Sequence, residues 1–201
     1  MNLITNMEPF LSKLKEKRII LASNSPRRQE LLRGLELDFV VKVNPVDETV
    51  PTDLPAEYAA AYLSKLKAEN YPDTLAENEI LITADTVVSI NGRILGKPNS
   101  EKEAFEMIRS LSGTTHTVMT AVTIKDHKRS VTLEDETKVT LRFLDEEEIW
   151  HYVRQYRPFD KAGAYGIQEW IGFVGVTSIE GSYFTVMGFP QHLVYQQLKR
   201  W

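Results

Sequence analysis

The sequence has no cysteine, and its few histidines are scattered. Among 201 residues there are four histidines, at positions 116, 127, 151 and 192. The absence of cysteine excludes disulfide bonds and thiolate metal sites. The histidines lie far apart and lack the spacing of a metal-ligand motif. We therefore interpret them as structural or surface residues.

Long apolar runs and an excess of positive charge are also missing. No segment approaches the roughly 18 consecutive apolar residues of a membrane span, and residues 1–17 lack the apolar core of a signal peptide. The formal net charge is -4, so the chain has no general attraction for nucleic acid. We therefore expect a cytoplasmic protein without membrane or nucleic-acid partners. The sequence leaves open whether the chain forms a homodimer.

Apolar periodicity predicts strands that alternate with helices. Strands are expected from residue 19 and at 39–43, 80–90, 93–95, 115–125, 136–143, 174–179 and 183–186. Helices are expected from residue 26, at 55–70, 100–111 and 145–155, and from residue 190. Asn91-Gly92 is typical of a two-residue hairpin, and Ser100 with Glu103 is typical of a capping box. This order predicts an α/β fold: a mixed twisted sheet with flanking helices, and two lobes around a central cleft.

Two adjacent arginines occupy the first turn of the first expected helix. Residues 19–28 read Ile-Ile-Leu-Ala-Ser-Asn-Ser-Pro-Arg-Arg, in which Ser25 is a good N-cap. Cations are unfavourable at a helix N-terminus, which is itself positive, unless an anion lies between them. We therefore predict a phosphate beside Arg27 and Arg28, with further hydroxyls from Ser23 and Ser25. The alternative is that both arginines are solvated surface residues.

The same argument makes a prediction about stability. Because each arginine opposes the helix dipole, its removal relieves an unfavourable interaction. Arg27→Ala and Arg28→Ala are therefore expected to keep or raise the thermal stability of the ligand-free protein, while each weakens phosphate handling.

A single acid, Asp85, interrupts the apolar segment 80–90. An ionised carboxylate is costly to bury there unless it meets a cation, a metal ion or water in a cleft. Lys97 follows the hairpin that begins after Asp85, and Pro98 holds it extended, so both side chains are expected in one neighbourhood. The alternative is a structural Asp85 whose carboxylate accepts hydrogen bonds from nearby backbone amides.

Further charges come from a loop and from the second expected helix. Val46-Asp47-Glu48 places acids after a strand, and Lys67 shares the inward face of its helix, whereas Lys65 points elsewhere. Taken alone, Glu48 belongs to a solvated turn and Lys67 lies along the surface. Together with the residues above, they form the set that a metal-bound polyphosphate requires. The sequence therefore predicts a divalent metal ion, Mg²⁺ or Mn²⁺.

A series of segments in this chain resembles the Maf proteins, a family named for septum formation and regarded as nucleoside triphosphate pyrophosphatases. In family order they are Leu-Ala-Ser-Asn-Ser-Pro-Arg-Arg-Gln-Glu-Leu-Leu, Ala-Asp-Thr-Val-Val, Lys-Pro, Leu-Ser-Gly-Thr-Thr-His-Thr-Val-Met-Thr-Ala-Val, Asp-Lys-Ala-Gly-Ala-Tyr-Gly-Ile-Gln and Gly-Ser-Tyr-Phe-Thr-Val-Met-Gly-Phe-Pro. The resemblance implies a Maf/ITPase-like fold with a nucleotide in the cleft. It also implies one domain at residues 18–201, preceded by an N-terminal extension at 1–17.

The resemblance implies hydrolysis of a nucleoside triphosphate between its α and β phosphates. Asp85 matches the proton acceptor that activates water, and with Glu48 it is the expected metal ligand. Positions that contact phosphate or stabilise the transition state are matched by Arg27, Arg28, Lys67 and Lys97. Positions associated with substrate choice are matched by Arg28, Thr86 and Gln168.

The segment that ends at Gln168 resembles the branch of the family that acts on dTTP and UTP, rather than the branch that acts on 7-methyl-GTP. The Gln168 amide offers a donor and an acceptor to the O4/N3 edge of uracil or thymine. The expected substrates therefore include modified pyrimidine nucleotides as well as dTTP and UTP. Asn24 and Glu169 stand where the family pattern has glycine, and Glu169 is expected to place a charge near the base pocket. The alternative function is a nucleotide-binding regulator of septum formation that does not hydrolyse its ligand, for which Asp85 is unnecessary.

Overall fold

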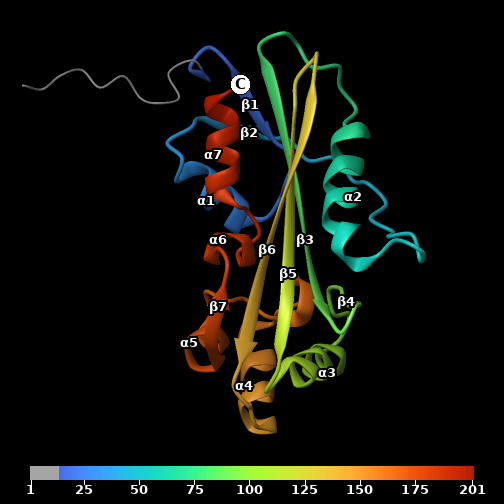
Figure 1. The fold of residues 1–201 in the computed structure, drawn as a ribbon, viewed down its shortest axis with the longest axis vertical. Coiled ribbons are helices and arrows are strands. Elements are labelled where there is room, and N and C mark those ends of the chain that lie inside the picture. Colours follow the sequence, from blue (N-terminus) through green and yellow to red (C-terminus); the bar gives the residue numbers. More distant parts are fainter. Residues whose placement is uncertain (1–13) are drawn as a thin grey trace, which may run out of the picture.

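The computed structural model describes residues 14–201. Residues 1–13, which make up most of the extension expected at 1–17, lie outside the described residues. The described chain forms a seven-stranded mixed sheet with helices on both sides (Figure 1). The predicted α/β class, with flanking helices on a mixed sheet, is confirmed.

The sheet combines a small parallel part with a larger antiparallel part. Its strands are β1 (Arg18–Leu21), β2 (Phe39–Val41), β3 (Glu79–Ile90), β4 (Arg93–Leu95), β5 (Thr115–Lys125), β6 (Ser130–Leu141) and β7 (Val176–Glu180). The order is β2-β1-β3-β5-β6-β7, with β4 paired to β3. β1 runs parallel to β2 and β3, whereas the other pairs are antiparallel. The long strands β3, β5 and β6 connect the two ends of the molecule (Figure 1).

The helices divide between the faces and the ends of this sheet. They are α1 (Pro26–Arg33), α2 (Ala56–Glu69), α3 (Glu101–Leu111), α4 (Glu146–Tyr156), α5 (Trp170–Gly175), α6 (Tyr183–Val186) and α7 (Gln191–Lys199). In Figure 1, α1 and α7 lie on one side of the long strands and α2 lies on the other, while α3, α4 and α5 gather at the lower end. Within residues 14–201, no helix is both long and apolar enough to cross a membrane.

Two large apolar clusters occupy opposite ends of the molecule and form the cores of two lobes. The first packs β1 and β3 against α1 and α7, and includes Ile19, Leu32, Ile82, Val194 and Leu198. The second packs α3, α4 and α5 around the other end of the sheet, and includes Phe105, Ile108, Leu141, Tyr152 and Ile171. Burial of these side chains is the main driving force that holds each lobe together.

Local turn chemistry agrees with the sequence at the hairpin and only partly at α3. Asn91 and Gly92 have φ angles of 51° and 75°, the left-handed conformation that a two-residue hairpin of this type requires. Ser100 caps α3, because its hydroxyl accepts from the Glu103 N–H at 3.1 Å. The Glu103 carboxylate, however, accepts from the Asn99 N–H at 2.8 Å and not from that of Ser100. The expected capping box is therefore displaced by one residue.

The expected strand at 183–186 is wrong, because this segment forms the short helix α6. Its aromatic and β-branched residues favour a strand, but β6 already pairs with β5 and β7. The helical turn buries Thr185 completely, and the Thr185 carbonyl accepts from the Thr120 hydroxyl at 2.7 Å. A contact with β5 therefore decides the structure of this segment against its local propensity.

Two other differences concern element boundaries and short helices. β6 begins at Ser130 rather than at residue 136, because its ladder with β5 continues to the pair of Ser130 and Lys125. The helix α5 and a 3-10 turn at Ala162–Ala164 are not among the expected elements. Both are short and contain glycine, so they have little apolar periodicity to detect.

The interrupted edge of β3 creates the opening in which the site lies. β1 pairs with β3 as far as Ile82, and β4 pairs with it from Val88. Asp85 and Thr86 lie between these two points. Successive strand residues face opposite sides of a sheet, so Asp85 contacts α2 while Thr86 contacts α1.

Candidate active site

Two adjoining cavities run from the N-terminus of α1 toward the turn that holds Gln168. They share Ser25, Arg27, Arg28, Lys67, Lys97 and Asp160. One cavity adds Ser23 and Glu48, and the other adds Asp85, Thr86 and Gln168. Every site residue predicted from the sequence therefore lines this groove between the two lobes.

The start of α1 has the local structure that the sequence predicts. The Ser25 hydroxyl accepts from the Arg28 N–H at 3.4 Å, and the Ser25 N–H donates to the Ser23 hydroxyl at 3.2 Å. Arg27 extends along the groove and donates to the Asp160 carboxylate at 2.9 Å. The helix N-terminus, with its positive dipole, thus presents serine hydroxyls and a cation to the cavity, which suits an anionic ligand.

Arg28 has a second role that its sequence position does not reveal. Its guanidinium donates through Nε to the Gly188 carbonyl at 3.0 Å and through Nη2 to the Thr86 hydroxyl at 3.1 Å. Burial lowers the pKa of Arg28, while the negative charge of Asp85 acts in the opposite direction. Gly188 has a φ of 95°, and a Cβ there would lie 3.0 Å from the Thr86 hydroxyl. Arg28 therefore joins α1, β3 and the segment after α6.

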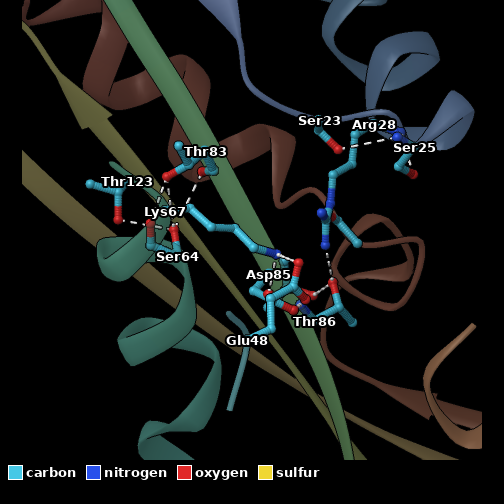
Figure 2. Close-up of polar contacts among 12 residues, drawn as sticks. Ser23, Ser25, Arg28, Glu48, Ser64, Lys67, Thr83, Asp85, Thr86 and Thr123 are labelled. Atoms are coloured by element: carbon cyan, nitrogen blue, oxygen red, sulfur yellow. Dashed lines mark hydrogen bonds and ion pairs between the residues drawn. The ribbon is translucent and has the colours of Figure 1, made fainter. Parts of the chain in front are cut away.

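Lys67 lies between the two acids expected to hold a metal ion (Figure 2). Its ammonium is 3.0 Å from Glu48 Oε1 and 2.5 Å from Asp85 Oδ2. The other oxygen of Asp85 accepts from the Thr86 N–H at 2.7 Å. Asp85 thus contacts both a cation and a backbone amide. The contacts expected under the two alternatives, a nearby cation and hydrogen bonds from backbone amides, are therefore both present. Lys65, in contrast, is exposed and lies beside Glu69.

A buried group of hydroxyls sets the position of α2 on the sheet (Figure 2). Ser64, one helical turn before Lys67, lies 2.9 Å from the Thr123 hydroxyl, and the Thr83 hydroxyl donates to the Ser64 carbonyl at 2.7 Å. All three of these polar residues are fully buried. Because they join α2 to β3 and β5, they fix the height of Lys67 relative to Asp85.

The acids of the groove can supply only part of a metal coordination shell. Residues 14–201 contain no group of three or more His, Cys, Asp or Glu side chains arranged for a metal ion. Glu48 and Asp85 nevertheless converge on one point, because both contact the same lysine nitrogen. Mg²⁺ is commonly held by one or two carboxylates together with substrate phosphates and water. The donor set therefore fits a metal ion that binds together with a polyphosphate.

The far end of the groove is formed by the segment that contains Gln168. Gln168 is partly buried and lines the cavity beside Tyr165 and Gly166. The Tyr165 hydroxyl lies 2.7 Å from His116 Nε2, and burial raises the pKa of this tyrosine. Burial also lowers the pKa of His116 to about 4. The pair of Tyr165 and His116 beside Gln168 is therefore uncharged at neutral pH.

Sequence reasoning missed two further charged residues of the groove. Asp160 and Lys161 line the groove, and Lys161 is buried. The signal was present, because both belong to the Asp-Lys-Ala-Gly-Ala-Tyr-Gly-Ile-Gln segment. Glu169 does bring a charge close to Gln168, as expected, but its carboxylate pairs with Lys161 at 3.1 Å and accepts from the Tyr152 hydroxyl.

Residues 18–201 match the family model described as Maf-like protein. This chain belongs to the Maf-like protein family. The dTTP/UTP pyrophosphatase of Flavobacterium johnsoniae is 49% identical over 92% of this chain and 96% of that protein. The protein of the same name from Bacteroides fragilis (strain YCH46) is 49% identical over 95% of this chain and 100% of its own length. That from Porphyromonas gingivalis (strain W83) is 47% identical over 94% of this chain and 97% of its own length. The solved Ham1 protein of Staphylococcus aureus aligns with a TM-score of 0.42 at 16% identity, over 62% of this chain and 72% of that one.

Proposed function

We propose that this protein hydrolyses dTTP and UTP to the nucleoside monophosphate and pyrophosphate. The observation that carries the proposal is the pairing of Lys67 with both Asp85 and Glu48 inside the groove that also holds Arg27 and Gln168. This arrangement combines a carboxylate able to accept a proton, cations for phosphate and an amide for a base. The names of the Maf-like relatives supply the substrates.

Asp85 is assigned to accept the proton of the attacking water. Its Oδ1 is held by the Thr86 N–H and its Oδ2 by Lys67, so the carboxylate has a defined orientation toward the groove. A positioned general base contributes typically 10²–10⁴-fold to the rate. In-line attack on the α-phosphorus then breaks the bond to the bridging oxygen, and pyrophosphate leaves.

The cations of the groove are assigned to the triphosphate. Arg27, Lys97 and the positive end of the α1 dipole bind the β and γ phosphates, where negative charge grows as pyrophosphate departs. Ser23 and Ser25 add hydroxyl donors at the same place. Lys67 lies next to Asp85, so it stabilises the α-phosphate in the transition state.

Glu48 and Asp85 are assigned to hold a divalent metal ion, Mg²⁺ or Mn²⁺, together with the substrate. When bound, the ion supplies positive charge that neutralises the phosphate oxygens. Asp85 is on β3 and Glu48 is on the loop before α2, and the Lys67 ammonium lies between their carboxylates.

Base choice is assigned to Gln168 with Arg28 and Thr86. The Gln168 amide pairs with the O4/N3 edge shared by uracil and thymine. Cytosine presents the opposite pattern of donor and acceptor at this edge. A site that hydrogen-bonds the uracil and thymine edge therefore rejects cytosine, because the polar groups of the site are left without partners when cytosine is bound.

The test is pyrophosphate release from a panel of nucleoside triphosphates with Mg²⁺. Wild-type protein is expected to prefer UTP and dTTP, and Asp85→Asn to lose about two or more orders of magnitude in turnover while it keeps its fold and its affinity for nucleotide. Glu57→Gln, on the exposed first turn of α2, is the matched control. Near wild-type turnover of Asp85→Asn would remove Asp85 from the mechanism, and nucleotide binding without turnover by the wild type would favour a regulator instead.

A further inference from the structure

A buried hydroxyl closes the turn that carries Gln168. The Glu169 N–H donates to the Gly166 carbonyl at 3.0 Å, so residues 166–169 form a four-residue turn with Gln168 in its third position. Tyr152 of α4 reaches this turn from the core. Its hydroxyl accepts from the Gly166 N–H at 3.0 Å and donates to the Glu169 carboxylate. One oxygen atom thus joins the first and last residues of the turn.

Lys161 compensates the charge of Glu169. Its ammonium is 3.1 Å from Glu169 Oε1 and 2.7 Å from Asp160 Oδ1, and its side chain is only 8% exposed. Asp160 in turn accepts from Arg27 at the phosphate end of the groove. A buried carboxylate without such a cation is strongly destabilising. The Lys161 ammonium therefore provides a cationic partner for the Glu169 carboxylate next to the turn.

The packing leaves the turn little freedom to shift. A Cβ at Gly166 would lie 2.9 Å from the Glu169 carboxyl carbon and 3.1 Å from Lys161 Cε. The ion pair thus rests directly against the backbone of the turn. Tyr152 is fully buried, and burial together with the bond to Glu169 raises the pKa of its hydroxyl, which remains a donor.

We propose that Tyr152 and Glu169, supported by Lys161, are positioning residues that hold Gln168 for base selection. Tyr152 and Glu169 are not among the residues that line the groove, so they act through the turn. The inference deepens the proposed function and rests on it. If the turn loosens, Gln168 loses its orientation toward the O4/N3 edge, while Asp85 and the phosphate contacts stay in place. Discrimination between bases then falls more than the chemical step does.

The first test compares Tyr152→Phe with Tyr156→Phe. Tyr156 is on the same helix and stacks on Tyr152 with ring centroids 5.0 Å apart, but it is exposed. Tyr152→Phe is expected to reduce the ratio of kcat/KM for UTP over CTP by about tenfold, mainly through a higher KM for UTP, as fits the loss of a hydrogen bond to a charged group. Tyr156→Phe is expected to keep the wild-type ratio. Inhibition by inorganic tripolyphosphate, which has no base, should be unchanged in both.

The second test keeps the inference falsifiable if Tyr152→Phe fails to fold. Glu169→Ala is expected to lower the UTP over CTP ratio in the same way, and Glu169→Gln, which retains an oxygen acceptor for Tyr152, to recover most of it. A wild-type ratio in folded Tyr152→Phe or Glu169→Ala, or equal losses for UTP and CTP, would overturn the inference and leave the proposed function intact. Wild-type protein that releases no pyrophosphate from UTP or dTTP would overturn both.

Discussion

Arg28→Ala is expected to destabilise the ligand-free protein, in contrast to the expectation from the helix dipole alone. The guanidinium donates to the Gly188 carbonyl and to the Thr86 hydroxyl. A hydrogen bond that involves a charged group contributes about 1.5–3 kcal/mol. Removing a cation from a helix N-terminus returns only about 0.3–1 kcal/mol. The loss outweighs the gain, so the free energy of unfolding should fall by about 2 kcal/mol or more.

Arg27→Ala is the internal comparison, because Arg27 lies at the same positive helix end as Arg28 but has a different hydrogen-bond partner. Arg27 pairs with Asp160, whose side chain is 57% exposed. Such exposed ion pairs contribute about 0–1 kcal/mol, which the relief of the dipole offsets. The free energy of unfolding of Arg27→Ala should therefore stay close to that of the wild type.

The assay is thermal and urea unfolding of both variants without nucleotide and in a phosphate-free buffer. In a protein of this size, 1 kcal/mol corresponds to a Tm shift of about 2–4 °C, so Arg28→Ala should melt roughly 4–8 °C below the wild type. Arg28→Lys keeps the charge but not the forked geometry of the guanidinium, so its melting temperature should lie between those of Arg28→Ala and the wild type. Equal melting temperatures for Arg28→Ala and wild type would refute the structural role of Arg28. A drop in Arg27→Ala as large as that in Arg28→Ala would refute the assigned difference between the two arginines.

The remaining predictions concern the base, the metal ion and pH. Gln168→Ala should lower kcat/KM for UTP more than for CTP and narrow the gap by about 1–3 kcal/mol, whereas equal losses would mean that Gln168 only supports the pocket. EDTA should abolish pyrophosphate release, and Glu48→Gln should raise the Mg²⁺ concentration needed for half-maximal rate; an unchanged Mg²⁺ dependence would exclude Glu48 as a ligand. Burial lowers the pKa of His116 from 6.5 to about 4, so as pH falls this histidine is protonated in the unfolded state before it is protonated in the folded state. Its contribution to the free energy of unfolding is therefore fully present above pH 6.5, and about 3 kcal/mol is lost as pH falls toward 4. His116→Gln should flatten the pH dependence of urea unfolding in this window, and an unaltered slope would contradict the assignment.

The parts of the fold that were predictable from sequence depend on short-range physics. The hairpin at Asn91 and Gly92 requires left-handed backbone, and the cap at Ser25 requires a hydroxyl beside free N–H groups, so each is visible within a few residues. The inward placement of Lys67 follows from the helical period of α2. The strand expected at 183–186 failed for the opposite reason, because a contact between Thr185 and β5 outweighs local propensity.

By itself, the sequence determined most of the strands and helices, the serine caps of α1 and α3, the hairpin turn, and most of the charged residues in the groove. Those features arise from interactions between residues that are neighbours along the chain. Only the tertiary structure decided what each charge contacts: Arg28 meets Gly188 across 160 positions, and Tyr152 reaches Gly166 and Glu169 from another helix. Such partners come together when the two lobes pack onto one sheet. Periodicity reports which face of an element is buried and carries no information about the distant residue that meets it.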